Sequence, residues 1–226
     1  CVALLALCAG PALAEGEGTK LSVSGNGTVL VKSDLAIVTV GVREASADVL
    51  VAQATVNEKI AAMKQALLDA GVQETEINTD SINIYANYDY SDNTEVIVGY
   101  TANNSLSVRT TDIDNVGALI DAAFAAGANT LDNVQFTVQD DSEAREQALT
   151  KAVEDARRKA EVLAAAAGLQ IASIESIAES GVYTYDSMRN YAMMDEAATE
   201  SGGAGTLVQA ALVSVDASVS MDFILQ

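Results

Sequence analysis

The sequence has 226 residues with 32 Asp or Glu against 12 Lys or Arg, so the net charge is −20. Histidine and tryptophan are absent, there is one proline, and both cysteines lie within the first eight residues. The charge argues against nucleic-acid binding, which needs Lys and Arg to neutralise phosphates. The lack of histidine excludes Ser-His-Asp and Cys-His nucleophiles and the usual zinc ligand sets.

The N-terminal residues resemble the end of a secretory signal. They are apolar and uncharged, and the small residues Ala12 and Ala14 match the A-x-A cleavage pattern. We therefore expect residues 1–14 to be a signal-peptide remnant and residues 15–226 to be the mature protein. The apolar run is shorter than the about 20 residues of a membrane-spanning helix, so we expect no transmembrane segment in the mature chain. Lipidation at Cys8 is the alternative to cleavage after Ala14.

Apolar residues that alternate with polar ones predict strands, and apolar residues three or four apart predict helices. In chain order the pattern reads β-β-α-β-β-α-β-α-β-β. Neighbouring strands without a helix between them imply hairpins, which favours an α+β fold with largely antiparallel sheets and about three helices. The predicted strands are residues 20–31, 36–43, 81–90, 96–110, 131–138, 171–185 and 213–225.

Capping residues mark the ends of the predicted helices. Ser46 is the expected N-cap of the first helix, Thr111 or Asp112 that of the second, and the third begins near Ser142. Glycines are expected to follow the C-termini of the three helices in turn, at Gly71, Gly127 and Gly168.

The third helix carries alanine at every fourth position from 144 to 164, which allows close approach to a sheet or to another helix. Its other face could bind an anionic partner, but acids interleave the bases, which favours a solvated face with ion pairs. The basic residues are Arg145, Lys151, Arg157, Arg158 and Lys159, and the expected pairs are Glu154–Arg158, Asp155–Lys159 and Arg157–Glu161.

No motif indicates a reaction. Gly25 and Gly27 begin like a dinucleotide-binding loop, but Leu30 replaces the third glycine and a strand follows, so we expect a bulge or a close backbone contact. Acid pairs arise by chance among 32 acids, so a carboxylate hydrolase is a weak alternative. Calcium is another weak alternative, with oxygen ligands at Asp89, Asp92, Asn93 and Glu95. We therefore expect no catalytic residues, no cofactor and no metal.

The seven tyrosines fall in two places, and three methionines lie beside the second. Residues 186–205 are expected to form a mobile loop, because they are rich in glycine and break the strand pattern. Since tyrosine and methionine favour interfaces, these residues could form a subunit contact or a ligand surface, or be ordinary strand faces. They are Tyr85, Tyr88, Tyr90, Tyr100, Tyr183, Tyr185, Met188, Tyr191, Met193 and Met194.

Several strings in order resemble the SIMPL-domain family of bacterial periplasmic proteins. They are residues 23–27, the Ser33-Asp34 turn, the passage 71–79, the tyrosine-rich strand to Tyr90, the alanine helix ending at 163–168, and strand 213–225. The sequence departs from the family pattern at two turns. The family commonly has Pro before the aspartate, where this chain has Ser33, and Pro-Gly before the last strand, where this chain has Gly205-Thr206. Those two turns could therefore be built differently here.

The resemblance implies an exported α+β protein, periplasmic and either free or associated with the outer membrane. It also implies a large homo-oligomer with a role in oxidative or envelope stress, and it transfers no catalytic residues. We therefore expect a non-enzymatic, self-assembling periplasmic protein. The alternative is a periplasmic module that binds a small molecule or a partner protein, whose identity the sequence does not reveal.

Overall fold

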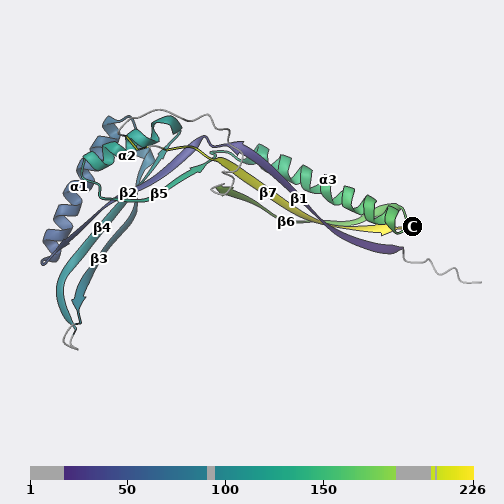
Figure 1. Ribbon diagram of the computed structural model, residues 1–226, viewed down its shortest axis with the longest axis horizontal. Helices are drawn as coiled ribbons and strands as arrows, with labels where there is room; N and C mark the ends of the chain where they lie inside the picture. Colours follow the sequence, from purple (N-terminus) through teal and green to yellow (C-terminus); the bar gives the residue numbers. More distant parts are fainter. Residues whose placement is uncertain (1–17, 91–94, 187–204, 207) are drawn as a thin grey trace, which may run out of the picture. The chain divides into compact units, whose positions relative to one another are not determined.

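The computed structural model describes residues 18–90, 95–186, 205–206 and 208–226. Its helices and strands follow the predicted order, with two additional 3₁₀ turns, and the α+β fold is confirmed (Figure 1). No described helix is long and apolar enough to cross a bilayer. The elements are β1 (Thr19–Lys32), β2 (Leu35–Ser46), α1 (Val49–Asp69), β3 (Ile77–Asp89), β4 (Val96–Thr110), α2 (Val116–Ala125), β5 (Thr130–Thr137), α3 (Ser142–Ala166), β6 (Ile171–Asp186) and β7 (Leu212–Leu225).

The strands form two antiparallel sheets, one in the order β1-β7-β6 and one in the order β3-β4-β2-β5. The expected pairing of neighbours in the chain holds for β3 with β4 and for β6 with β7. It is wrong for β1 and β2, which lie in different sheets because β1 pairs with β7 and β2 pairs with β4 and β5.

The chain divides into two compact units. In its described parts, the first unit comprises the chain up to Gly27 together with Ala148–Val182 and Ala217–Gln226. The second unit comprises the described parts of Thr28–Gln147 and Tyr183–Asp216. The first unit thus holds most of α3 and its three-stranded sheet, and the second holds α1, α2 and the four-stranded sheet.

The core of the second unit lies between its sheet and the helices α1 and α2. Val38 lies opposite Val108, and Val40 opposite Leu106, so β2 and β4 present a continuous apolar layer. This layer packs against α1 and α2 in one buried cluster. β3 begins at Ile77, four residues earlier than predicted, because Ile77 pairs with Val108 and extends the sheet.

The core of the first unit depends on small residues. The alanines of α3 from Ala148 to Ala164 are at most 2% exposed. A Cβ atom at Gly25 would lie 2.0 Å from the Ala152 carbonyl oxygen, and one at Gly27 would lie 2.0 Å from the Ala148 carbonyl oxygen. The two glycines therefore let α3 lie directly on β1, and the predicted close backbone contact is confirmed.

The opposite face of the same sheet is polar. β7 alternates strictly, with buried Val215 and Phe223 on one face and partly exposed Asp216 and Asp222 on the other. Asp222 accepts hydrogen bonds from the hydroxyls of Ser22 at 2.5 Å and Ser176 at 2.6 Å. These hydrogen bonds lower the pKa of the Asp222 carboxyl. A single aspartate thus joins all three strands of the sheet.

Charged residues of α3 also bind β1. Asp155 accepts the backbone N–H of Asn26 at 3.0 Å, and its carboxylate lies 2.6 Å from the ammonium of Lys159. Lys159 in turn donates to the backbone carbonyl of Ser24 at 2.9 Å. The hydrogen bonds from Lys159 and from the Asn26 N–H lower the pKa of Asp155 from 3.8 to about 2.

Asp155→Asn is expected to make the fold less sensitive to acid. The ionised carboxylate stabilises the folded state above pH 3.8, and this contribution is lost as the pH falls from 3.8 towards about 2. We expect the free energy of unfolding, measured by urea titration at a series of pH values, to fall less steeply across this window in the variant. Glu154→Gln, at the neighbouring exposed acid, is the control. Parallel pH profiles for Asp155→Asn and the unmodified protein would contradict the contact.

The predicted glycines at the helix C-termini are confirmed, whereas the predicted N-caps of α1 and α2 are wrong. Ser46 ends β2, and Asp48 is the N-cap of α1, its carboxylate accepting two N–H groups of the first turn, the shorter at 2.7 Å. A 3₁₀ turn precedes α2, which begins at Val116 without a side-chain cap, so Thr111 and Asp112 do not cap it. The predicted C-terminal glycines are confirmed, with positive φ values of 96° at Gly71, 111° at Gly127 and 72° at Gly168.

Candidate functional site

The first group of tyrosines lies on the hairpin of β3 and β4. Tyr85 lies opposite Thr101, Tyr88 opposite Ile97, and Tyr100 opposite Ala86. Tyr85, Tyr88 and Tyr90 are 49%, 43% and 66% exposed, whereas Tyr100 is half-buried. The rings of Tyr88 and Tyr90 are 6.2 Å apart between centroids, so they form one aromatic surface.

Large exposed aliphatic side chains outside the predicted set lie on the same hairpin, on both faces of its strands. We call the whole set the hairpin patch, and each of its members is at least 40% exposed. Exposed apolar patches of this kind are rare on monomeric proteins and usually mark a contact site. The hairpin patch consists of Ile82, Ile84, Tyr85, Tyr88, Tyr90, Val96, Ile97 and Val98.

The part of the hairpin patch that lies on the helix-bearing face of the sheet continues the apolar layer of the core beyond the helices. Ile84 lies opposite Ala102, which is buried beside Val42 under α1. α1 packs on β2 and β4 and has few contacts with β3, so Ile82 and Ile84 are left uncovered within the described residues. β3 is also an edge strand of the sheet. An uncovered apolar row on an edge strand can accept a further strand and side chains from another molecule.

The second group of tyrosines lies at the end of β6. Tyr183 and Tyr185 are exposed, with ring centroids 6.1 Å apart. Thr184, between them, donates to Asp141 at 2.5 Å, and Asp141 also pairs with Arg145 at 2.7 Å. The pair is thus held in place by the start of α3, but no ring contact joins it to the described tyrosines of the hairpin. Met188, Tyr191, Met193, Met194 and residues 187–204 of the expected loop lie outside the described residues.

The described acids do not gather around a metal site. No three His, Cys, Asp or Glu side chains among the described residues lie close enough to hold a metal ion, and Asp92 and Asn93 lie outside them. One polar cluster joins the Ser105 hydroxyl to Ser81 at 2.8 Å and to Asp80 at 3.2 Å. Ser105 is fully buried, so its hydroxyl links β4 to β3 and is inaccessible to a substrate.

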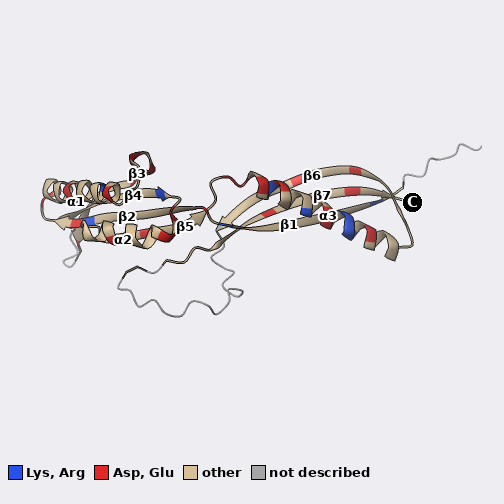
Figure 2. Ribbon diagram, turned by 90° about the horizontal axis from the view of Figure 1, so that it is seen from above, with Lys and Arg blue, Asp and Glu red and all other residues tan. Residues whose placement is uncertain are grey.

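The outer face of α3 carries acids and bases in alternation (Figure 2). Of the predicted pairs, Asp155–Lys159 forms. Arg158 pairs with Asp155 instead of Glu154, because one carboxylate accepts both cations. In the described part of the chain, Arg157 and Glu161 do not pair with each other. The interpretation as an ion-paired face is therefore correct for part of α3.

A family model described as SIMPL, protein of unknown function (DUF541), matches residues 21–223. The chain belongs to the SIMPL family. The match covers parts of both compact units and includes all or most of each strand and helix. The family resemblance predicted from the sequence is therefore confirmed.

Curated relatives of this SIMPL protein carry two kinds of name. The 26 kDa periplasmic immunogenic protein of Brucella melitensis is 28% identical over 168 residues, which are 72% of this chain and 67% of that protein. The uncharacterized protein YggE of Escherichia coli K12 is 25% identical over 148 residues, 66% of this chain and 60% of that protein. YggE of Edwardsiella ictaluri is 26% identical over 162 residues, 71% of this chain and 68% of that protein.

The unusual Gly205-Thr206 segment has a structural role in this SIMPL protein. Thr206 donates its hydroxyl to Asp121 of α2 at 2.6 Å and its backbone N–H at 3.1 Å. A Cβ at Gly117 would lie 2.2 Å from the Thr206 carbonyl oxygen, so the glycine allows this contact. The segment before the last strand is therefore held on α2 by a carboxylate.

Proposed function

We propose that this protein is a non-enzymatic periplasmic protein that assembles with copies of itself through the hairpin patch and supports tolerance of oxidative and envelope stress. The assembly rests on one observation, the uncovered apolar row on the edge strand β3. The location rests on the leader-like N-terminal residues and on the name of the Brucella relative. The stress role rests on the family resemblance.

Covering the hairpin patch with a second copy is more favourable in free energy than leaving its apolar side chains in water. Burying a side chain the size of Ile84 or Ile97 stabilises an interface by about 1.5–3 kcal/mol, and the edge of β3 can add main-chain hydrogen bonds. A two-fold arrangement would set β3 beside β3 of the second copy, so that the two apolar rows contact each other along the shared edge. Larger assemblies would need a second contact, for which Tyr183 and Tyr185 are the candidates.

The net charge of −20 opposes this assembly, because identical protomers repel each other. Salt screens that repulsion, as the Debye length falls from about 30 Å at 0.01 M to about 8 Å at 0.15 M ionic strength. We therefore expect sedimentation velocity to show a larger assembled fraction at the higher ionic strength. Assemblies that dissociate as salt is added would contradict an apolar interface and indicate one held by ion pairs.

The stress role is tested in cells. A strain that lacks the protein is expected to survive peroxide and envelope stress less well than its parent. A plasmid-borne copy should restore survival, whereas a copy with Ile84→Lys should not if assembly is needed. Equal survival of the deletion strain and its parent would remove the stress role but leave the assembly proposal standing.

A further inference from the structure

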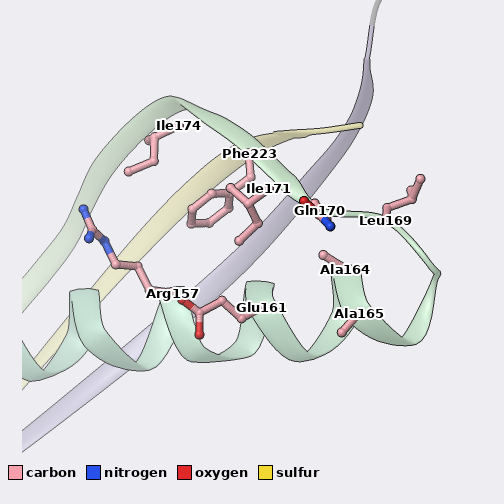
Figure 3. A pocket seen from close by; sticks show the side chains of 9 residues that line it. All are labelled: Arg157, Glu161, Ala164, Ala165, Leu169, Gln170, Ile171, Ile174 and Phe223. Carbon is pink, nitrogen blue, oxygen red and sulfur yellow. The ribbon is translucent and has the colours of Figure 1, made fainter.

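A pocket opens between the C-terminal half of α3 and the start of β6, within the first unit (Figure 3). Its volume is about 380 Å³, which lies in the range of about 300–1,000 Å³ typical of small-molecule sites. The pocket lies outside the hairpin patch, which belongs to the second unit.

The floor and walls of the pocket are apolar. Phe223 of β7 is buried at the base, and Ile171 and Ile174 of β6 stand beside it (Figure 3). Ala164 and Ala165 of α3 form the opposite wall, and their small side chains leave the space open. Ile174 is 38% exposed although it lines a concave surface. An apolar group that entered the pocket would therefore cover surface that now faces water.

Two opposite charges stand at the rim. Arg157 and Glu161 are one helical turn apart on α3, and both line the pocket (Figure 3). Neither has an ion-pair partner among the described residues, although Arg158 and Lys159 between them both pair with Asp155. The guanidinium and the carboxylate at the rim are thus available to a ligand.

We propose that this pocket binds an α-amino acid with a large apolar side chain, such as leucine or phenylalanine. The ligand carboxylate would pair with Arg157 and its ammonium with Glu161, while its side chain would lie against Ile171, Ile174 and Phe223. A zwitterion fits better than an anionic amphiphile, because Glu161 and the net charge of −20 both repel anions. It fits better than an apolar cation, because Arg157 would lie beside the ligand's positive charge.

The ligand class is tested by titrating the full chain with leucine, phenylalanine and three analogues of leucine, with backbone amide NMR shifts as the readout. Leucine is expected to bind saturably and to shift amides of residues 157–174. Leucine methyl ester lacks the carboxylate and N-acetyl-leucine lacks the ammonium, so each should bind about tenfold more weakly or worse. Glycine, which lacks the apolar side chain, should not bind. Failure of both leucine and phenylalanine to saturate up to their solubility limits would overturn the proposal.

Substitutions of Arg157 and Glu161 show which group of the ligand each side chain contacts. Arg157→Gln should weaken leucine binding about tenfold and should not weaken leucine methyl ester, whose ammonium is no longer repelled by the guanidinium. Glu161→Gln should likewise weaken leucine and should not weaken N-acetyl-leucine, whose carboxylate is no longer repelled by Glu161. Arg158→Gln is the matched control, because Arg158 pairs with Asp155 and does not line the pocket. If Arg157→Gln weakened leucine and its methyl ester equally, the direct carboxylate contact would be wrong.

A variant that fills the pocket tests the site without changing its charge. Ala165→Leu places a larger side chain at an exposed position of the wall, and it should abolish binding of leucine and phenylalanine while the thermal melting temperature stays close to that of the unmodified protein. Unchanged affinity in this variant would place the binding elsewhere. These readouts do not depend on self-assembly, so the pocket proposal can fail or stand independently of the proposed function.

Discussion

Gly25→Ala and Gly27→Ala are each expected to disrupt the packing of α3 on β1. Each new Cβ would lie 2.0 Å from a backbone carbonyl oxygen of α3, and no flexible side chain can move aside to relieve that clash. Overpacking a core usually destabilises a protein by about 1–3 kcal/mol, and we expect these substitutions to reach or exceed the upper end of that range. Urea unfolding followed by circular dichroism measures the effect.

Two further variants make this test specific. Ser24→Ala, at an exposed position between β1 residues that face α3, should leave the unfolding free energy nearly unchanged. Ala156→Gly should not rescue Gly25→Ala, because the clash with the Ala152 carbonyl oxygen remains when the Ala156 methyl group is removed. Gly25→Ala and Gly27→Ala proteins as stable as the unmodified one would show that α3 does not lie in direct contact with β1.

The double variant Ile84→Lys and Tyr88→Lys is expected to shift the protein from assemblies to protomers. Each substitution places a charge where the proposed interface is apolar, and the loss of about 1.5–3 kcal/mol per buried side chain weakens a contact roughly tenfold to a hundredfold. Lysine is chosen because it reduces the net charge of −20. Dissociation could then not be explained by greater repulsion between protomers. Sedimentation velocity gives the assembled fraction.

Val51→Lys is the matched control for the hairpin substitutions. Val51 is 54% exposed on α1, comparable with Ile84 at 40% and Tyr88 at 43%, but it lies outside the hairpin patch. This variant should assemble like the unmodified protein. If the double variant assembled normally and remained folded by circular dichroism, the hairpin patch would not be the interface, and the tyrosine pair of β6 would be examined next.

Local patterns were sufficient to predict the helices and strands. The strict alternation of β7 and the four-residue spacing of alanine in α3 each correspond to one buried face. The glycines after the helices were also predictable, because a left-handed residue at that position favours glycine. The position of the α1 cap was not, because Ser46 and Asp48 are both good acceptors and β2 extends through Ser46.

Pairing between distant segments could not be predicted in the same way. β1 and β2 follow each other in the chain, and only the tertiary structure shows that β1 pairs with β7 instead. The exposure of Ile84 could not be predicted for a related reason. Alternation shows that a strand has an apolar face, but it does not show whether a helix covers that face. The pocket brings Arg157, Ile174 and Phe223 together from three elements, and no spacing in the sequence links them.

Light scattering coupled to size exclusion on residues 15–226 measures whether the protein assembles with copies of itself. At physiological ionic strength the molar mass is expected to be a multiple of the protomer mass and to fall as the protein is diluted. A molar mass equal to that of one protomer at every concentration would contradict self-assembly.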